Sequence, residues 1–409
     1  MRQFLKTTAH AGRAVVGMVM VLELVFWSAG CVPPIGSGRH VTSRTVREGV
    51  IHRTILIEEG PWVVNVLEID LRKGDLGFRA VHAEDRVVGL ETTSSMAERS
   101  SDSAWQTVAA LNADFFHKDG ETVNTQISDG EYLRAVRPEL DDSGRVLLPR
   151  SQFGLTGKGK PVVDRFVFEG SVLLPGSPRC RLASVNVIDR GGFVLYNSHR
   201  GERTPSDSIR RAVFEIGLAR AQQCGDTVLY LVSGPVGRGG GLPIPENGAV
   251  LSAYHDSLWP STRSVSFGDS VMVVRRMAPV VGELELLVGG TPRIVLDGAS
   301  VAGVEGHMER TVPSFTFKRH PRTGVGCSRD STLLYFLTVD GRQESSAGMT
   351  LPEFADLMIS LGVYQGLNLD GGGSTTMVVE GLVVNSPSDP TGERPVGNCL
   401  LLQAKRPVD

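Results

Sequence analysis

The spacing of hydrophobic and polar residues along the 409-residue chain predicts many strands and few helices. Residues 63–71 alternate between apolar and polar side chains over their second half, which is the period of a half-buried strand. Apolar runs at 107–111, 213–218, 227–232, 271–275 and 333–339 are predicted as further strands, although residues 209–223 also fit a helix. The pattern therefore indicates an α+β fold, with a strand-rich mixed sheet and few helices.

One helix has clear start and stop signals. Thr350 and Glu353 form a capping box, and Gly362 stands where the helix should end. Phe354 and Met358 recur at helical spacing and predict a buried face. A second, shorter helix is predicted at residues 92–99.

Two acidic residues follow predicted strands on either side of the longer helix. Strand 333–339 ends at Asp340, and the apolar run after the helix ends at Asp370. Because this strand–helix–strand order resembles a βαβ unit, we expect both carboxylates at the same edge of one sheet.

Three consecutive glycines follow Asp370, within the stretch 367–379 that reads LNLDGGGSTTMVV. Such a run costs conformational entropy, so it is expected where the chain needs a positive φ or a close approach to its backbone. The carboxylate and the hydroxyls of Ser374 and Thr375 favour the close approach of a ligand. A P-loop is excluded, because no G-K-[ST] follows the glycines and the next segment is a strand. No G-x-S-x-G surrounds Ser374, so we expect it to bind substrate or orient Asp370 rather than act as a nucleophile.

Four segments end an apolar run in a polar cluster, and together the clusters carry both signs of charge. The clusters are Asn112 with Asp114, Arg322 with Thr323, Asp340 with Arg342, and Asp370 with Ser374 and Thr375. Carboxylates alone would fit a metal site or an ordinary glycosidase, whereas guanidinium groups bind phosphate through paired N–H donors. The backbone N–H groups of Gly371, Gly372 and Gly373 are expected to point at the same anion. The clusters therefore predict a site for an anionic substrate, at strand ends and beside the glycine-rich loop.

Composition and charge exclude other classes of function. The net charge of −3 and the lack of a basic tract with interleaved aromatic residues argue against nucleic-acid binding. The nine histidines show no metal-ligand spacing, and Cys180, Cys224, Cys327 and Cys399 show none either. These four cysteines fit up to two disulfides, in any of three pairings, or buried free thiols.

The N-terminus has the features of an export signal. Basic residues precede an apolar run at 14–27, which only Glu23 interrupts, and small residues at 28–30 precede Cys31. This arrangement resembles a bacterial lipoprotein signal, in which Cys31 is lipidated, although Ser28 stands where such signals usually carry leucine. The alternatives are an ordinary secreted protein and an uncleaved anchor. We expect an exported protein of the cell envelope, held to a bacterial membrane by an N-terminal lipid.

The expected division of the chain follows from these features. Residues 1–30 are a signal peptide, 31–45 a tether, 46–285 an N-terminal β-rich part of the catalytic unit, 286–403 the part richest in motifs, and 404–409 a tail. After residue 45 no proline-rich or charged linker is present, which argues against a clean boundary between independent domains.

Seven motifs resemble the phosphodiester glycosidase family in both order and spacing. They are AALNADFF (109–116), VGGTPRIVLDG (288–298), HPRTGVG (320–326), TVDGR (338–342), GMTLPEFADLM (348–358), LNLDGGGSTTM (367–377) and VVNSPSD (383–389), the last followed by Arg394. The resemblance is strongest over residues 286–403. It implies hydrolysis of a sugar-1-phosphodiester, of the N-acetylglucosamine-1-phosphodiester type, to free sugar and a phosphomonoester.

The resemblance also implies the residues of the site. Transferred motif by motif, these are Asn112, Asp114, Arg322, Thr323, Asp340, Arg342, Asp370, Gly371, Gly372, Gly373, Ser374 and Thr375. Asp114, Asp340 and Asp370 are the expected catalytic residues, and the others are expected to bind substrate. Many members have glycine where Asp114 stands and alanine where Gly324 stands, and either difference affects which diester fits.

The chemistry of the clusters agrees with this reaction. A phosphate monoester leaves readily, so stabilising the departing phosphate matters more than general-acid help. We expect Asp370 or Asp340 to stabilise the sugar cation or activate water, and Arg322 and Arg342 to hold the phosphate. Whether a divalent cation shares this work is left open. The alternatives are a non-catalytic binder of phosphorylated polysaccharide and an enzyme of exopolysaccharide processing that acts on ordinary glycosidic bonds.

Overall fold

The computed structural model describes residues 38–206, 212, 214–237, 239–262 and 264–406. Residues 38–409 form one compact unit. The predicted signal peptide and the predicted lipidation site Cys31 lie outside the described residues. The predicted tether at 31–45 overlaps the first strand, which begins at Arg39. Of the described helices, none has the length and apolar character needed to cross a membrane.

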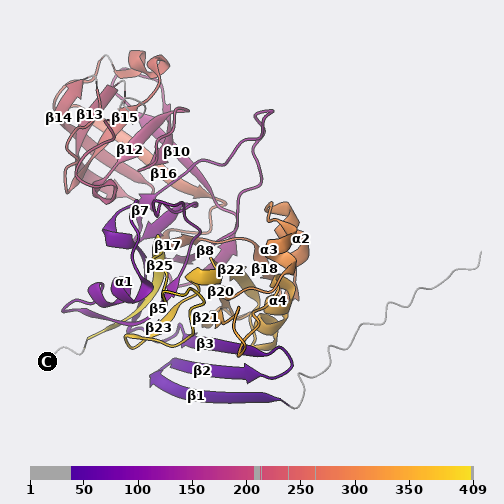
Figure 1. Cartoon of the computed structure of the whole chain (residues 1–409). Coiled ribbons are helices and arrows are strands. Elements are labelled where there is room, and N and C mark those ends of the chain that lie inside the picture. The colour runs from indigo at the N-terminus through magenta and orange to yellow at the C-terminus, as the bar shows by residue number, and fades with distance from the viewer. Residues whose placement is uncertain (1–37, 207–211, 213, 238, 263, 407–409) are drawn as a thin grey trace, which may run out of the picture. The chain divides into compact units, whose positions relative to one another are not determined.

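The largest sheet carries most of the predicted site. Its eight strands are antiparallel to their neighbours, and Figure 1 shows β1, β2 and β3 side by side along one border. In spatial order the strands are β1 (Arg39–Arg47), β2 (Val50–Ile57), β3 (Trp62–Asp70), β21 (Leu333–Val339), β20 (Arg322–Cys327), β22 (Gln365–Asn368), β18 (Arg293–Leu296) and β19 (Ala299–Ser300).

Two five-stranded antiparallel sheets complete the body of the molecule. One contains β24 (Leu382–Val383), β23 (Met377–Val379), β5 (Trp105–Asn112), β25 (Asn398–Lys405) and β4 (Leu76–His82). The other contains β7 (Glu131–Arg134), β6 (Gln126–Ser128), β17 (Leu284–Gly289), β8 (Gln152–Thr156) and β9 (Pro161–Asp164). One apolar core takes buried side chains from all three sheets, among them Leu67, Leu111 and Phe153.

A closed seven-stranded barrel is formed by the middle of the chain. Its strands are β10 (Val167–Leu173), β11 (Cys180–Val185), β12 (Phe193–Tyr196), β15 (Gly248–Ala253), β13 (Phe214–Cys224), β14 (Thr227–Gly237) and β16 (Ser270–Ala278). Val167 pairs with Ala278, so the segment enters and leaves the barrel at neighbouring points. The barrel core also contains Ile127 and Leu287 from the adjoining sheet, so barrel and body share apolar packing.

Helices are few, as predicted, and short. They are α1 (Thr93–Arg99), α2 (Ala302–Met308), α3 (Pro313–Phe317) and α4 (Leu351–Ser360), with 3₁₀ turns at Ala83–Asp85, Ser198–Arg200, Asp256–Thr262 and Gly372–Ser374. The predicted capping box of α4 is confirmed, because the Thr350 hydroxyl accepts from the Glu353 amide and the Glu353 carboxylate accepts from the Thr350 amide. Buried Phe354 and Met358 pack α4 onto the eight-stranded sheet.

The predicted fold class is wrong in its architecture. The prediction was one mixed sheet in an α+β fold, but the described residues form antiparallel sheets and a barrel, so the protein is mostly β. The pairing of β11 with β12 is the one parallel pair among the described strands. Residues 214–224 are strand β13, which rules out the helical alternative for this stretch. Apolar runs identify strands but not their partners, because pairing is set by contacts distant in sequence.

Candidate active site

The ends of three adjacent strands bring the predicted acidic and basic residues together. Strands β21 and β22 both run antiparallel to β20, which lies between them, so they are parallel to each other. The end of β21 before Asp340, the end of β22 before Asp370 and the start of β20 at Arg322 therefore lie at one sheet edge. This confirms the prediction that the two carboxylates share an edge.

Asn112 connects the second sheet to this edge. It is the last residue of β5, and only 1% of it is exposed. Its side-chain oxygen accepts hydrogen bonds from the Thr323 hydroxyl (3.0 Å) and the Thr376 amide (3.0 Å). Its side-chain nitrogen donates to the carbonyl of Asp370 (2.6 Å). Asn112 and Thr323 therefore hold the strand ends in register, and their side chains have a structural role at the site.

Asp370 lies at the start of the glycine-rich loop and remains partly exposed. Its amide donates to the carbonyl of Ala113 (2.9 Å), which fixes the loop to the end of β5. Loss of hydration raises the pKa of Asp370 to about 7, with a further increase from the charge of Asp114. The nearby Ser374 hydroxyl and the positive charge of Arg394 oppose this rise in the pKa. Asp370 therefore changes protonation near neutral pH.

Asp340 is more deeply buried than Asp370, with 3% of the residue exposed. One of its carboxylate oxygens accepts from the Ser386 amide (3.0 Å) and the Asn385 side chain (3.3 Å). Burial raises the pKa of Asp340 to about 6, and these two donors oppose the rise. Asp340 thus anchors the segment that carries Asn385.

Asp114 belongs to a polar cluster next to the site. Its two carboxylate oxygens accept from the amide and the side chain of Asn124 (2.8 and 2.7 Å). Burial raises its pKa, and the hydrogen bonds from Asn124 oppose this. A Cβ added at Gly289 would lie 2.4 Å from this carboxylate, so β17 also packs closely against it. Asp114 acts on Asp370 through its charge.

The two predicted phosphate-binding arginines have different environments. Arg322 is 1% exposed, and its guanidinium donates to the carbonyls of Met349 (2.8 Å), Phe315 (2.7 Å) and Lys318 (3.1 Å). Burial lowers the pKa of Arg322 to about 9. Arg322 therefore ties α3 and the start of α4 to β20, and three of its hydrogen bonds are used within the protein.

Arg342 is the exposed arginine of the site. Its φ of 61° is a left-handed conformation that few non-glycine residues adopt. Its guanidinium lies 3.1 Å from where a Cβ of Gly372 would be and 3.5 Å from the His320 ring. Within the described residues it has no carboxylate partner. Arg342 therefore presents an uncompensated positive charge beside the glycine-rich loop.

The glycine-rich loop is explained by its own packing. A Cβ at Gly371 would lie 2.7 Å from the carbonyl oxygen of Pro321, and Gly372 has a φ of +63°. The Gly372 amide donates to Pro321, and the Ser374 and Thr375 amides donate to carbonyls within the loop. The expectation that the glycine N–H groups form an anion nest is thus wrong for Gly372, whose N–H group is used internally.

Gly373 lies against an ion pair that the sequence-based assignment did not include. Arg394 donates two hydrogen bonds to Asp389 (2.6 and 2.9 Å), and a Cβ at Gly373 would lie 2.3 Å from this guanidinium. Arg394 also lowers the pKa of Asp370. The signal was present, because Arg394 follows the motif at 383–389, but no role was assigned to it. Asn385, in the same motif, was missed in the same way.

Buried hydroxyl groups complete the site. Thr375 and Thr376 are almost fully buried, and neither side-chain oxygen has a hydrogen-bond partner within the described residues. Unpaired buried polar atoms are uncommon and need an explanation such as a bound ligand. Among the described residues, no group of three or more His, Cys, Asp and Glu side chains is arranged to hold a metal ion. The four cysteines between residues 180 and 399 are free thiols, two of them buried.

These features define a β-rich protein whose acidic and basic side chains converge at one sheet edge around a packed glycine loop. Residues 232–403 match the family model described as phosphodiester glycosidase. This match confirms the resemblance that the motifs carry.

Curated relatives agree over a short segment. The chain is 43% identical over 68 residues to the N-acetylglucosamine-1-phosphodiester alpha-N-acetylglucosaminidase of Bos taurus, and 40% identical over 68 residues to the Homo sapiens enzyme of that name. It is 42% identical over 71 residues to an uncharacterized prophage-derived protein of Bacillus subtilis. Each match covers 17% of this chain but only 11–13% of the relative.

Solved structures support the fold over a greater length. A hypothetical protein from Synechocystis has a TM-score of 0.67 at 19% identity, over 89% of this chain and 64% of its own. A protein from Burkholderia pseudomallei has a TM-score of 0.67 at 20% identity, over 90% of this chain and 97% of its own. At these identities the similarity establishes the fold alone.

Proposed function

We propose that this protein is a glycosidase that hydrolyses a sugar-1-phosphodiester of the N-acetylglucosamine type, releasing the sugar and leaving a phosphomonoester. The observation that carries the proposal is the convergence of Asp340, Asp370 and Arg342 at one sheet edge within the family match. The names of the curated relatives support the substrate class.

The two carboxylates differ in what they can do. Asp340 is 3% exposed, and one of its oxygens is already held by Asn385 and Ser386, which suits a positioning role. Asp370 is partly exposed and has a pKa of about 7, so it can accept a proton near neutral pH. We therefore assign the proton-accepting role to Asp370.

The reaction requires little acid assistance. Water adds to the anomeric carbon while the bond between that carbon and the bridging phosphate oxygen breaks, so this oxygen departs with the phosphate. The proton lost by the water passes to the Asp370 carboxylate, which also stabilises the positive charge that develops on the sugar ring. Arg342, which has no carboxylate partner among the described residues, holds the departing phosphate, and Arg394 adds positive charge nearby.

The test is an assay of purified protein with N-acetylglucosamine-1-phosphodiester, in which free sugar and phosphomonoester are measured. We expect turnover by the natural protein and a loss of roughly 100-fold or more in kcat for Asp370→Asn. Arg342→Gln should lose activity as well, whereas Arg145→Gln, at an exposed loop position, should not. Retention of phosphorylated glycans without any turnover would instead identify a non-catalytic binder.

We also propose that the protein is exported to the cell envelope and anchored through a lipid on Cys31. The support is the order of basic, apolar and small residues before this cysteine. Mass spectrometry of the mature protein should find a lipid-modified Cys31 at its N-terminus. A cleaved product with unmodified Cys31 would contradict the anchor but leave the catalytic proposal intact.

A further inference from the structure

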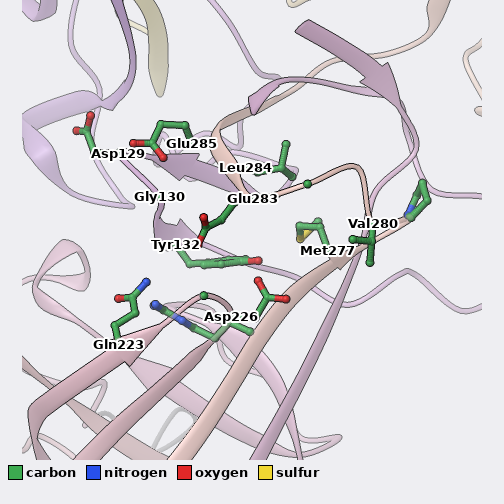
Figure 2. Close-up of a pocket in the computed structure, with 14 residues that line it drawn as sticks. Asp129, Gly130, Tyr132, Gln223, Asp226, Met277, Val280, Glu283, Leu284 and Glu285 are labelled. Atoms are coloured by element: carbon green, nitrogen blue, oxygen red, sulfur yellow. The ribbon is translucent and has the colours of Figure 1, made fainter. Parts of the chain in front are cut away.

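A cavity of about 240 Å³ lies where the barrel meets the sheet that contains β7 and β17. Its wall combines Tyr132 from β7, Asp226 from the turn between β13 and β14, Met277 from β16, and Glu283 from the chain that leads into β17. Figure 2 shows these side chains facing a common space. None of the candidate active-site residues lines it, so it is a separate feature of the molecule.

Acidic side chains outnumber basic ones in the wall of the cavity. Asp226, Glu283 and Glu285 contribute carboxylates to the lining, and within the described residues none of them has a salt-bridge partner. The basic residue of the wall, Arg275, donates to Glu131 at 2.6 Å, and its guanidinium lies 5.1 Å from the centroid of the Tyr132 ring, so its charge offsets only part of the negative charge of the wall. Carboxylates gathered in a partly enclosed space repel one another, which favours a cationic occupant.

Tyr132 supplies an independent indication of a ligand. Only 7% of this residue is exposed, and its hydroxyl has no hydrogen-bond partner among the described residues. In Figure 2 the hydroxyl points into the cavity, towards Asp226. The charge of Asp226 adds to the effect of burial in raising the pKa of Tyr132, so the hydroxyl keeps its proton. The hydroxyl is therefore free to hydrogen-bond with a molecule that enters the cavity.

We propose that this cavity binds the primary ammonium group of a small amine. An ammonium group donates three hydrogen bonds, which the carboxylates of Asp226 and Glu283 and the oxygen of Tyr132 can accept. A metal ion is a poorer fit, because within the described residues no cluster of three or more acidic, His or Cys side chains has an arrangement that could hold one. The site does not depend on the proposed glycosidase activity.

The adjoining surface suggests two sources for the amine. A groove of about 560 Å³ shares Asp129, Gly130 and Gln223 with the cavity and continues past Gln222 and Asn247. Such amide side chains hydrogen-bond sugar hydroxyl groups as well as solvent. The ammonium group therefore belongs either to a free polyamine or to an amino sugar with an unacetylated nitrogen, whose ring would extend into the groove.

Isothermal titration calorimetry at low salt tests this site with three probes. They are spermidine, a glucosamine trisaccharide, and the fully N-acetylated trisaccharide as the uncharged control. We expect at least one of the two amines to bind and the acetylated sugar not to bind. Asp226→Asn and Glu283→Gln should each weaken binding about 10-fold or more, and Tyr132→Phe about 3- to 10-fold. Asp142→Asn, at an exposed position outside the cavity, is the matched control and should bind as the natural protein does.

Each outcome is decisive. Binding of spermidine alone identifies a polyamine site, and tighter binding of the glucosamine trisaccharide identifies an amino-sugar site. Failure of both amines to bind, or equal affinity in the cavity variants and the natural protein, would overturn the proposal. Thermal unfolding of each variant checks that it is folded. Turnover of the sugar phosphodiester should be unchanged in these variants. The amine-binding proposal and the glycosidase proposal can therefore be contradicted separately.

Discussion

At the residue scale, the protonation of Asp370 links activity and stability. Its pKa rises from 3.8 to about 7 because the folded protein dehydrates it. The folded state therefore binds more protons than the unfolded state between these pH values, and stability falls as pH rises through this window. Because the raised pKa of Asp370 lowers stability near neutral pH, selection for stability alone would not favour it, and it fits a functional role of this residue.

For the natural protein, we predict that kcat/KM increases with pH through about 7 and then levels off, because ionised Asp370 is the form that we propose to react. Between pH 4 and 7, ionisation of Asp370 should lower the free energy of unfolding by on the order of 1 kcal/mol per pH unit. In Asp370→Asn this contribution should vanish, so the variant gains stability relative to the natural protein from pH 4 to 7 and no further above it. Urea unfolding at several pH values measures the difference, and a constant difference would show that Asp370 does not titrate in this window.

A second prediction concerns Asn112. Asn112→Ala would leave the Thr323 hydroxyl and the Thr376 amide without their acceptor, and the Asp370 carbonyl without a donor. We expect a loss of about 2–4 kcal/mol in the free energy of unfolding. Thr323→Ser, which keeps the hydroxyl, is the matched control and should lose much less. If Asn112→Ala unfolds at the same urea concentration as the natural protein, these hydrogen bonds do not hold the strand ends together.

The motifs predicted which residues lie near the site better than they predicted what each one does. Asp340, Asp370 and Arg342 do meet at one edge, as their positions at strand ends imply. Arg322 and Arg342 look equivalent in sequence, yet the first is buried among carbonyl groups and the second is exposed. The difference depends on the placement of α3 and α4 over β20, and no local pattern reports it.

At the element scale, the glycine-rich loop is a tightly packed turn with a different constraint at each glycine. Gly372 needs its positive φ, whereas Gly373 needs room for the ion pair of Asp389 and Arg394. The sequence predicted that the glycines were necessary but assigned the close approach to a ligand. The groups that approach the glycines are Pro321, from a segment far before the loop in sequence, and the ion pair, from a segment that follows the loop.

Two glycine substitutions, one in this loop and one outside it, should therefore separate crowding from backbone strain. Gly373→Ala should displace the ion pair of Asp389 and Arg394 and reduce activity at least 10-fold, because a 1 Å misplacement near the chemistry is costly. Gly381→Ala is the control for strain: it has a φ of +78° but nothing within 4 Å of the added atom. It should lose about 1–2 kcal/mol of stability and keep its activity. Equal activity in both variants would mean that the ion pair has no part in catalysis.

Local signals explain which elements were predictable. The capping box and apolar spacing of α4 lie within one segment, and the structure confirms them. The separation into several antiparallel sheets and a barrel depends on pairs such as β5 with β25, which are far apart in sequence. A strand has the same apolar pattern in a closed barrel as in an open sheet. The hydrophobic pattern of the individual strands therefore did not reveal that these seven close into a barrel.

At the scale of the whole molecule, the segment matched by the family model is not a structural unit. The match begins at residue 232, inside strand β14 of the barrel, and it omits β3 and β5. Yet β3 pairs with β21, and β5 supplies Asn112. The site therefore needs strands from before the match, and the compact unit is residues 38–409.

The junction between barrel and body should make the two unfold together. Glu131 of β7 pairs with Arg275 (2.6 Å) and Arg220 (2.7 Å) of the barrel, and the Arg275 side chain is only 2% exposed. Glu131→Gln would leave that guanidinium buried without its carboxylate, at a cost of about 3–5 kcal/mol. In Glu131→Gln, we expect hydrogen exchange to become faster in barrel peptides than in β20–β22, because the barrel then opens before the body.

The matched control is Glu169→Gln, which removes the exposed pair of Glu169 with Arg276 next to Arg275 and should change stability by less than about 1 kcal/mol. Lowering the pH should destabilise the barrel junction in the same way as Glu131→Gln does. Burial raises the pKa of Glu131, but the charges of Arg275 and Arg220 outweigh this effect and lower the pKa overall. The ion pair therefore stabilises the fold above the ordinary pKa of glutamate, and this stabilisation is lost as the pH falls. Uniform acceleration of exchange across barrel and sheets would mean that the shared apolar core, rather than this ion pair, couples them.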